Sequence, residues 1–169
     1  MTSLRPAIRP AVAADMAAVA DLWHEGWHDG HAGRVPAGLT AERTLAAFHE
    51  RTPARVDETT VAVSDAGVLL GFVMVVGDEV EQVFVARDAR GSGVAGSLLA
   101  EAERQVAAAG RAEAWLAVVV GNLRARAFYE RQGWRDGGDL PYEVMAGGHT
   151  FVSPCRRYVK DLSQSDSQA

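Results

Sequence analysis

Cysteine is almost absent from this chain of 169 residues, since Cys155 is the only one. A single cysteine excludes an intrachain disulfide and a zinc site built from several thiolates, and it fits a reducing, cytoplasmic setting. Basic residues are also few, because 17 Lys and Arg stand against 22 Asp and Glu and give a net charge of −5. Nucleic-acid-binding domains usually carry a basic excess, so we expect no nucleic-acid partner.

Long hydrophobic runs are missing as well. The longest run covers residues 68–76 and includes Gly71, whereas a membrane-spanning helix needs about 20 apolar residues. Near the start of the chain, Arg5 and Arg9 are not followed by the apolar segment of a secretory signal. We therefore expect no membrane partner.

The remaining composition is that of one ordinary globular domain, with 48% hydrophobic and 23% charged residues. No repeat or linker divides the chain, so a single domain over residues 1–162 is expected. The last segment, 163–169, is small and polar, and we expect it to be a disordered tail.

Alternating helical and strand patterns predict an α/β fold, with a mixed sheet of six or seven strands and about four flanking helices. Strands are expected at 7–10, 59–64, 68–76, 79–85, 114–120 and 151–159. The predicted order of elements ends in two strands. The pattern locates only the last of them, at 151–159. Helices are expected from Asp15 to before Val35, from Thr40 through Leu45 and Phe48, and over 93–109 and 123–132.

The segment Arg90-Gly91-Ser92-Gly93-Val94-Ala95 joins a predicted strand to the start of a helix. Glycine lets backbone N–H groups approach a ligand closely, and a helix N-terminus favours an anion such as a diphosphate. The segment is not a Walker A motif, and it lacks the third glycine of a dinucleotide fingerprint. Taken alone, it is equally compatible with a turn that uses glycine for its geometry.

A second segment changes this balance: Asn122-Leu-Arg-Ala-Arg-Ala-Phe-Tyr-Glu-Arg-Gln-Gly-Trp134. The first segment, preceded by Val-Phe-Val, resembles the acetyl-CoA pyrophosphate loop of the GNAT superfamily of N-acetyltransferases, and the second resembles that family's other cofactor motif. Ala95 replaces a commoner glycine and Trp134 a commoner phenylalanine. The resemblance extends over roughly Ile8 to Leu162. It implies the GNAT fold, in which two central strands splay apart for the cofactor.

The resemblance implies an acetyl-CoA-dependent N-acetyltransferase that needs no metal and acetylates a primary amine of a small molecule or peptide by direct transfer. Dimers are common in such families, so a homodimer is considered alongside a monomer. The cofactor-binding residues implied are Val83, Val85, Arg90, Gly91, Ser92, Gly93, Val94, Ala95, Asn122 and Arg126.

Three residues are candidates for the chemistry. Tyr129 matches the family position whose hydroxyl reaches the CoA sulfur, and it would act as general acid unless it is only a core aromatic. Glu79 and Glu81 alternate onto one face of a strand, about 6.6 Å apart, and in the family that face meets the acceptor. Glu81 is the preferred base, acting through water, with Glu79 in reserve; both are also compatible with solvated edge positions.

The acceptor is expected to be recognised by residues that precede the cofactor motifs. Trp27 offers an aromatic face, Asp29 a charge for an ammonium group, and His28 and His31 add polar contacts. The alternative is that the tryptophan is a core anchor and the histidines are solvated. The region Tyr142–His149 is the second candidate for this role.

Two other functions compete with acetyl transfer. His24-Glu25-Gly26-Trp27-His28 fits the H-E-x-x-H pattern of zinc hydrolases. Gly26 weakens a helix there, however, and the zinc interpretation leaves both cofactor motifs unexplained. The other alternative is a module that binds acetyl-CoA without turnover.

Overall fold

The computed structural model describes residues 5–163, so the predicted tail lies outside the described residues except for Ser163. Seven strands form one sheet in the order β1-β2-β3-β4-β5-β7-β6, which confirms the mixed α/β sheet. The strands are β1 (Ala7–Pro10), β2 (Thr59–Val63), β3 (Leu69–Val76), β4 (Glu79–Val85), β5 (Glu113–Val119), β6 (Arg135–Ala146) and β7 (His149–Asp161).

Five α-helices and three short 3-10 turns accompany this sheet within residues 5–163. The helices are α1 (Met16–His31), α2 (Ala37–Glu42), α3 (Leu45–Arg51), α4 (Val94–Ala108) and α5 (Leu123–Arg131), and the turns are η1 (Ala13–Asp15), η2 (Pro53–Glu58) and η3 (Arg87–Ala89). None of the helices in this described part is long and apolar enough to cross a membrane.

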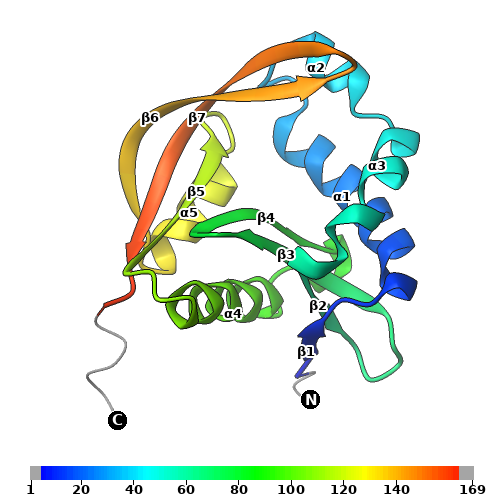
Figure 1. The fold of residues 1–169 in the computed structure, drawn as a ribbon, viewed down its shortest axis with the longest axis vertical. Helices are drawn as coiled ribbons and strands as arrows, with labels where there is room; N and C mark the ends of the chain where they lie inside the picture. The colour runs from blue at the N-terminus through cyan, green and yellow to red at the C-terminus, as the bar shows by residue number, and fades with distance from the viewer. Residues whose placement is uncertain (1–4, 164–169) are drawn as a thin grey trace.

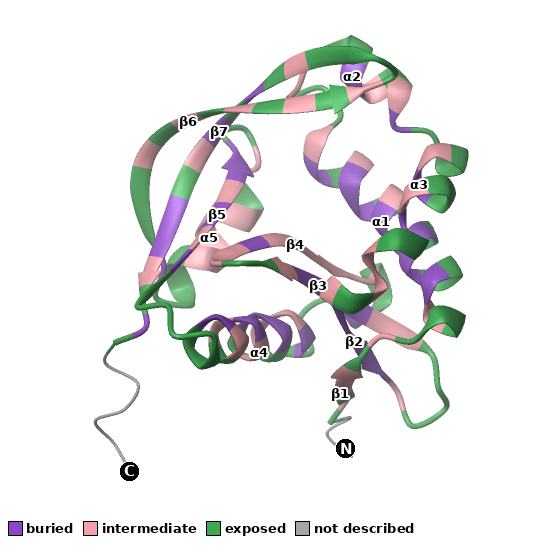
Figure 2. Cartoon of the chain, in the orientation of Figure 1, coloured by how far each residue is buried: buried purple, intermediate pink, exposed green. Residues whose placement is uncertain are grey.

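The helices cover the two faces of the sheet (Figure 1). Val94, Leu98, Ala102 and Val106 form the buried stripe of α4, as their helical spacing predicted, and they pack in one core cluster with Val73 of β3. The helices α1, α2 and α3 pack on the opposite face in a second cluster, which includes Phe72. Adjacent residues of β3 thus feed different cores, because successive side chains of a strand point to opposite faces. Figure 2 shows the buried stripes on α1 and α4.

The sheet opens at its centre. β4 and β5 are its only parallel neighbours in the described chain, and they pair at a single position, Glu79 with Trp115. Beyond that pair the two strands diverge, so the backbone of β4 after Glu79 has no sheet partner on the β5 side (Figure 1). The predicted splay of two central strands is therefore present.

The second expected helix is wrong in its bounds, since two short helices replace it. Thr40 lies inside α2, and the residue that caps a helix is Thr44, whose hydroxyl accepts the backbone N–H of Ala47 at 3.1 Å. Two threonines close together both matched the capping preference, and the break between them follows Glu42, which the hydrophobic pattern did not mark.

The unplaced strand is β6, which forms a long hairpin with β7. This hairpin arches over the open centre of the sheet, and its tip reaches α2 (Figure 1), where the ring of Phe151 approaches Gly38. β7 extends beyond the expected 151–159 at both ends. The strand pattern did not predict β6, because glycine and proline are unusual inside strands and β6 contains Gly137, Gly138 and Pro141. A register shift between Asp136 and Asp139 accommodates the two glycines.

Candidate active site

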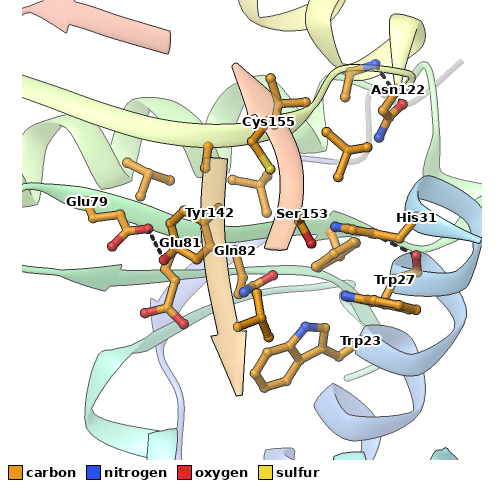
Figure 3. Close-up of a pocket in the computed structure, with 18 of the residues that line it drawn as sticks. Trp23, Trp27, His31, Glu79, Glu81, Gln82, Asn122, Tyr142, Ser153 and Cys155 are labelled. Carbon is orange, nitrogen blue, oxygen red and sulfur yellow. Dashed lines mark hydrogen bonds between the residues drawn. The ribbon is translucent and has the colours of Figure 1, made fainter. Parts of the chain in front are cut away.

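A cavity of about 540 Å³ occupies the open centre of the sheet. It is lined by α1, β4, β5, α5 and the hairpin, so segments more than a hundred residues apart in the sequence meet there (Figure 3). Seven residues predicted from the sequence line it: Trp27, His31, Glu79, Glu81, Val83, Asn122 and Tyr129.

The two glutamates of β4 have different partners. The hydroxyl of Tyr142 donates a hydrogen bond of 2.9 Å to the carboxylate of Glu79 (Figure 3), and burial raises the pKa of that carboxyl above its usual value. Glu81 instead forms an ion pair of 2.9 Å with Arg55. The ladder with β3 skips Glu81, since Met74 pairs with Gln82 and Val75 with Val80. Glu81 is therefore the extra residue of a β-bulge.

Tyr129 lies on α5 with its ring in the core beside Trp134 and Tyr158. Burial raises the pKa of its phenol to about 12, so the hydroxyl stays protonated at neutral pH. Within residues 5–163 this hydroxyl has no hydrogen-bond partner, although Tyr129 lines the cavity. A protonated donor at the cavity wall is thus available to a ligand.

The glycine segment has the geometry of a ligand-binding loop. Gly91 and Gly93 have φ of +77° and +87°, a region that side chains rarely adopt, and Gly93 is the N-cap of α4. Apart from the two chain neighbours, no heavy atom of residues 5–163 lies within 4 Å of a Cβ built at either glycine, so a side chain there would point into open space. The hydroxyl of Ser92 is already used, because it donates to the carbonyl of Ala89.

A second cavity of about 420 Å³ adjoins the loop and is rich in arginine. Its charged lining residues are Asp29, Arg34, Arg87, Arg90 and Arg124. Asn122 lines both cavities, and its side chain caps α5 by accepting the N–H of Ala125 at 3.3 Å. The two cavities therefore meet at Asn122, one basic and the other holding the glutamates and Tyr129.

Two glycines allow α1 to approach this region closely. A Cβ on Gly26 would overlap the ring of Phe84, and one on Gly30 would lie 3.0 Å from the side-chain nitrogen of Asn122. The sequence suggested that glycine weakens this helix. In the structure both glycines lie inside α1 and bring it against β4 and the start of α5.

Several predicted site residues do not line the larger cavity. Asp29 accepts hydrogen bonds from Arg87 and Arg90 at the basic cavity instead. The ring nitrogen Nε2 of His28 is 2.7 Å from the carbonyl oxygen of Arg43. Arg126 is held by the hydroxyl of Tyr158 and the carbonyl of Val120.

His24 and His28 do share a face of α1, with ring centroids 4.6 Å apart. However, Nε2 of His28 is occupied by the backbone contact to Arg43. No group of three or more His, Cys, Asp or Glu side chains within the described residues is arranged to hold a metal ion. The helical spacing in this segment has another explanation, since Trp23 and Trp27 belong to the buried stripe of the same helix.

The sequence missed cavity residues that come from the hairpin and from the segment between α2 and η2. They are Arg43, Arg51, Tyr142, Glu143, Ser153 and Cys155. Tyr142 and Glu143 both lie in the region 142–149, which the sequence offered as the second candidate for acceptor recognition, but neither was named for a role there. Cys155 is buried, which raises the pKa of its thiol to about 11 and keeps it protonated. No local signal pointed to the arginines, because their role depends on what they face.

Comparison with known proteins assigns the fold and the family. The model of the acetyltransferase (GNAT) family matches residues 18–134, and the chain belongs to this family. It is an acetyltransferase by family, and its seven-stranded mixed sheet is the GNAT fold. A comparison with curated proteins gives no match.

Solved structures with the same fold cover nearly the whole chain. YjaB from Escherichia coli, in its apo form, is 21% identical with a TM-score of 0.71, covering 91% of this chain and 96% of its own. A phosphinothricin acetyltransferase from Sinorhizobium meliloti with acetyl-CoA is 18% identical, with a TM-score of 0.67 and coverages of 92% and 88%. The PaiA N-acetyltransferase from Thermoplasma acidophilum with coenzyme A is also 18% identical, with a TM-score of 0.61 and coverages of 94% and 99%.

Proposed function

We propose that the protein transfers the acetyl group of acetyl-CoA to a primary amine of a small molecule or peptide. One observation carries this proposal: the gap between β4 and β5 leads from an open glycine loop and a basic cavity to a cavity that holds two glutamates and Tyr129. The family supplies the acetyl transfer, and the acidic acceptor side supports an amine as acceptor.

The residues of the chain fit acetyl-CoA along this path. Backbone N–H groups at Gly91, Gly93, Val94 and Ala95, at the start of α4, would hold the diphosphate, with Arg90 and Arg87 beside it. Val83 and Val85 would offer the unpaired backbone edge of β4 to the pantetheine arm. Asn122, where the cavities meet, would lie beside that arm. Ser92 and Arg126 have internal partners and contribute less in this assignment.

Two residues would handle the protons of a direct transfer. As the amine nitrogen bonds to the acetyl carbon and the carbon–sulfur bond breaks, Glu79 accepts the amine proton, directly or through water. Burial raises the pKa of Glu79 toward the working range of a base, whereas Glu81 is engaged by Arg55. The contacts therefore favour Glu79, reversing the order expected from the sequence.

Tyr129 would donate a hydrogen bond from its hydroxyl to the departing sulfur. An ordinary thiol has a pKa of about 8.5, below that of the buried phenol, so donation of a hydrogen bond is favoured over complete proton loss by Tyr129. The sulfur leaves as the thiol once solvent completes the proton balance.

A panel of primary amines, followed by CoA release with a thiol reagent, tests the proposal. We expect turnover with at least one amine and an acetylated amine in the product by mass spectrometry. Binding of acetyl-CoA by calorimetry without turnover on any amine would instead identify a module that only binds the cofactor.

A further inference from the structure

Two arginines, Arg43 and Arg51, line the tryptophan side of the larger cavity, and a third, Arg55, lies near the ring of Trp23. Arg43 ends α2, Arg51 ends α3 and Arg55 lies in η2. The guanidinium carbon of Arg51 lies 4.4 Å from the ring centroid of Trp23, and that of Arg55 lies 5.9 Å from it. The guanidinium carbon of Arg43 lies 5.9 Å from the ring centroid of Trp27. Because guanidinium groups stack on aromatic faces, these rings hold the cations at the cavity wall.

The three cations differ in their ion pairs. Arg55 pairs with Glu58 and Glu81, but neither Arg43 nor Arg51 forms an ion pair with any acid in residues 5–163. Arg43 is only 9% exposed, and its Nε has no hydrogen-bond partner. Burial lowers the pKa of Arg43, and burial together with the neighbouring arginines lowers that of Arg51 to about 10. Both guanidinium groups remain charged at neutral pH.

Three buried N–H groups on or beside these arginines have no hydrogen-bond partner in residues 5–163, and the nearby hydroxyl of Thr40, which can donate or accept, has none either. Besides Nε of Arg43, the N–H groups are Nη2 of Arg55 and the indole N–H of Trp23, which lies in the cavity wall (Figure 3). A buried donor without an acceptor costs free energy, and an unpaired buried cation costs more. One anionic group placed between them would satisfy several donors at once.

The opposite side of the same cavity carries negative charge. Figure 3 shows Glu79 and Glu81 across the cavity from Trp23 and Trp27. Glu143, which is exposed on β6, also lines it. His31 adds no positive charge, because burial lowers its pKa to about 4 and keeps the ring neutral. The cavity wall thus carries both charges: within the described chain, Arg43 and Arg51 lie beside the tryptophans without an ion pair, Glu79 is free of an arginine partner, and Glu81 is paired with Arg55 between them.

We infer that the acceptor carries a carboxylate as well as the amine, with the carboxylate bound by Arg51 and Arg43 and the amine directed to the glutamates. This assignment rests on the proposed function for the amine. A carboxylate suits the site because it matches the planar donor fork of arginine.

Paired acceptors test the inference: glycine, β-alanine, γ-aminobutyrate and lysine, each against its carboxamide. We compare wild type with Arg51→Gln, which removes the charge and keeps most of the volume. Arg104→Gln is the matched control, since Arg104 is exposed on α4 and pairs with Glu101. Each acceptor is compared with itself between variants, so the different basicity of acids and amides cancels.

At least one carboxylate acceptor should show a KM about 10- to 100-fold higher in Arg51→Gln, with its carboxamide changed less than twofold and kcat nearly constant. Arg104→Gln should leave both values unchanged. Equal losses for acid and amide, or no loss for either, would overturn the inference, because a merely structural arginine does not distinguish them. Melting temperatures of all variants identify a folding defect.

A binding measurement separates this inference from the proposed function. Calorimetry of the CoA-saturated protein with the same amino acids should detect binding that Arg51→Gln weakens at least tenfold. Binding without CoA release would support the anion site and reject the acetyl transfer to amines. Turnover of neutral amines, with no panel carboxylate bound or preferred, would reject the anion site and keep the transfer.

Discussion

The carboxylate of Asp29 accepts a hydrogen bond of 3.1 Å from the guanidinium of Arg90 in the glycine loop. The same carboxylate binds Arg87 at 2.9 Å, and these hydrogen bonds, that of Arg87 above all, hold its pKa below the usual range. Asp29 is therefore ionised at neutral pH at the point where our assignment puts the diphosphate. It competes with that anion for the arginines.

Replacing this carboxylate should strengthen cofactor binding. In Asp29→Asn we expect the dissociation constant for acetyl-CoA to fall about 2- to 5-fold at low salt, the range of an exposed charge interaction of up to about 1 kcal/mol. Glu25→Gln is the control, because Glu25 lies 3.7 Å from Arg87 and has no ion pair with Arg90. Calorimetry measures both. Weaker binding in Asp29→Asn would mean that the carboxylate orients the arginines rather than competing with the cofactor.

Removing the hydroxyl of Tyr129 should slow the transfer without loosening the cofactor. A hydrogen bond to a charged group is worth about 1.5–3 kcal/mol, so Tyr129→Phe should lower kcat on the order of 10²-fold. The half-buried ring is retained, and the affinity for acetyl-CoA should stay within about twofold. Steady-state kinetics and calorimetry check the two values, and unchanged turnover would exclude Tyr129 as the donor to the sulfur.

The pH profile should distinguish the two glutamates. Because the pKa of Glu79 is raised, its basic form is lost as the pH falls through a value above that of an ordinary glutamate. In the wild type, the fall of kcat/KM at acidic pH should therefore occur at a higher pH than the pKa of an ordinary glutamate. In Glu79→Gln this fall should disappear. Glu81→Gln should keep the fall and raise KM, since it frees Arg55. The reverse pattern would restore Glu81 as the base.

Stability should respond to Glu79 with a defined sign. A raised pKa in the folded state means that the protonated carboxyl is favoured by folding, so this contribution is present at low pH and lost as the pH rises through the folded value. Glu79→Gln should therefore gain in melting temperature over wild type as the pH rises from about 4 to 8. A constant difference over this range would indicate that the carboxyl does not titrate differently in the folded protein.

A negative charge at the start of α4 should block the cofactor. Gly93→Asp would place a carboxylate at the helix N-terminus, where the described part of the chain leaves a Cβ without a neighbour within 4 Å beyond the adjoining residues. Gly93→Asn has the same shape without the charge, and both residues tolerate positive φ better than most. We expect acetyl-CoA to bind at least tenfold more weakly to the Asp variant than to the Asn variant. Equal affinities in calorimetry would remove the diphosphate from this loop.

The sequence by itself determined the features that are local in the chain. The stripe of α4, the positive-φ loop at Gly91 and Gly93, and the segment from Asn122 to Trp134 are short motifs, whose meaning depends on neighbours a few residues away. They were enough to predict the family, the mixed sheet and most of its strands. Thr40 and Thr44 show the limit of local signals, since both satisfied the same capping preference and only packing selects between them.

Only the tertiary structure decided which groups meet in the cavities. Tyr142 reaches Glu79 across 63 positions, and Arg87 reaches Asp29 across 58. Such pairs leave no local pattern, because a charged side chain looks the same in the sequence whether it faces solvent, a counter-ion or a ligand. Arg43 and Arg51, which form no ion pair within residues 5–163, could be recognised only from the fold, which places them against Trp27 and Trp23, where burial removes the water that would otherwise solvate them.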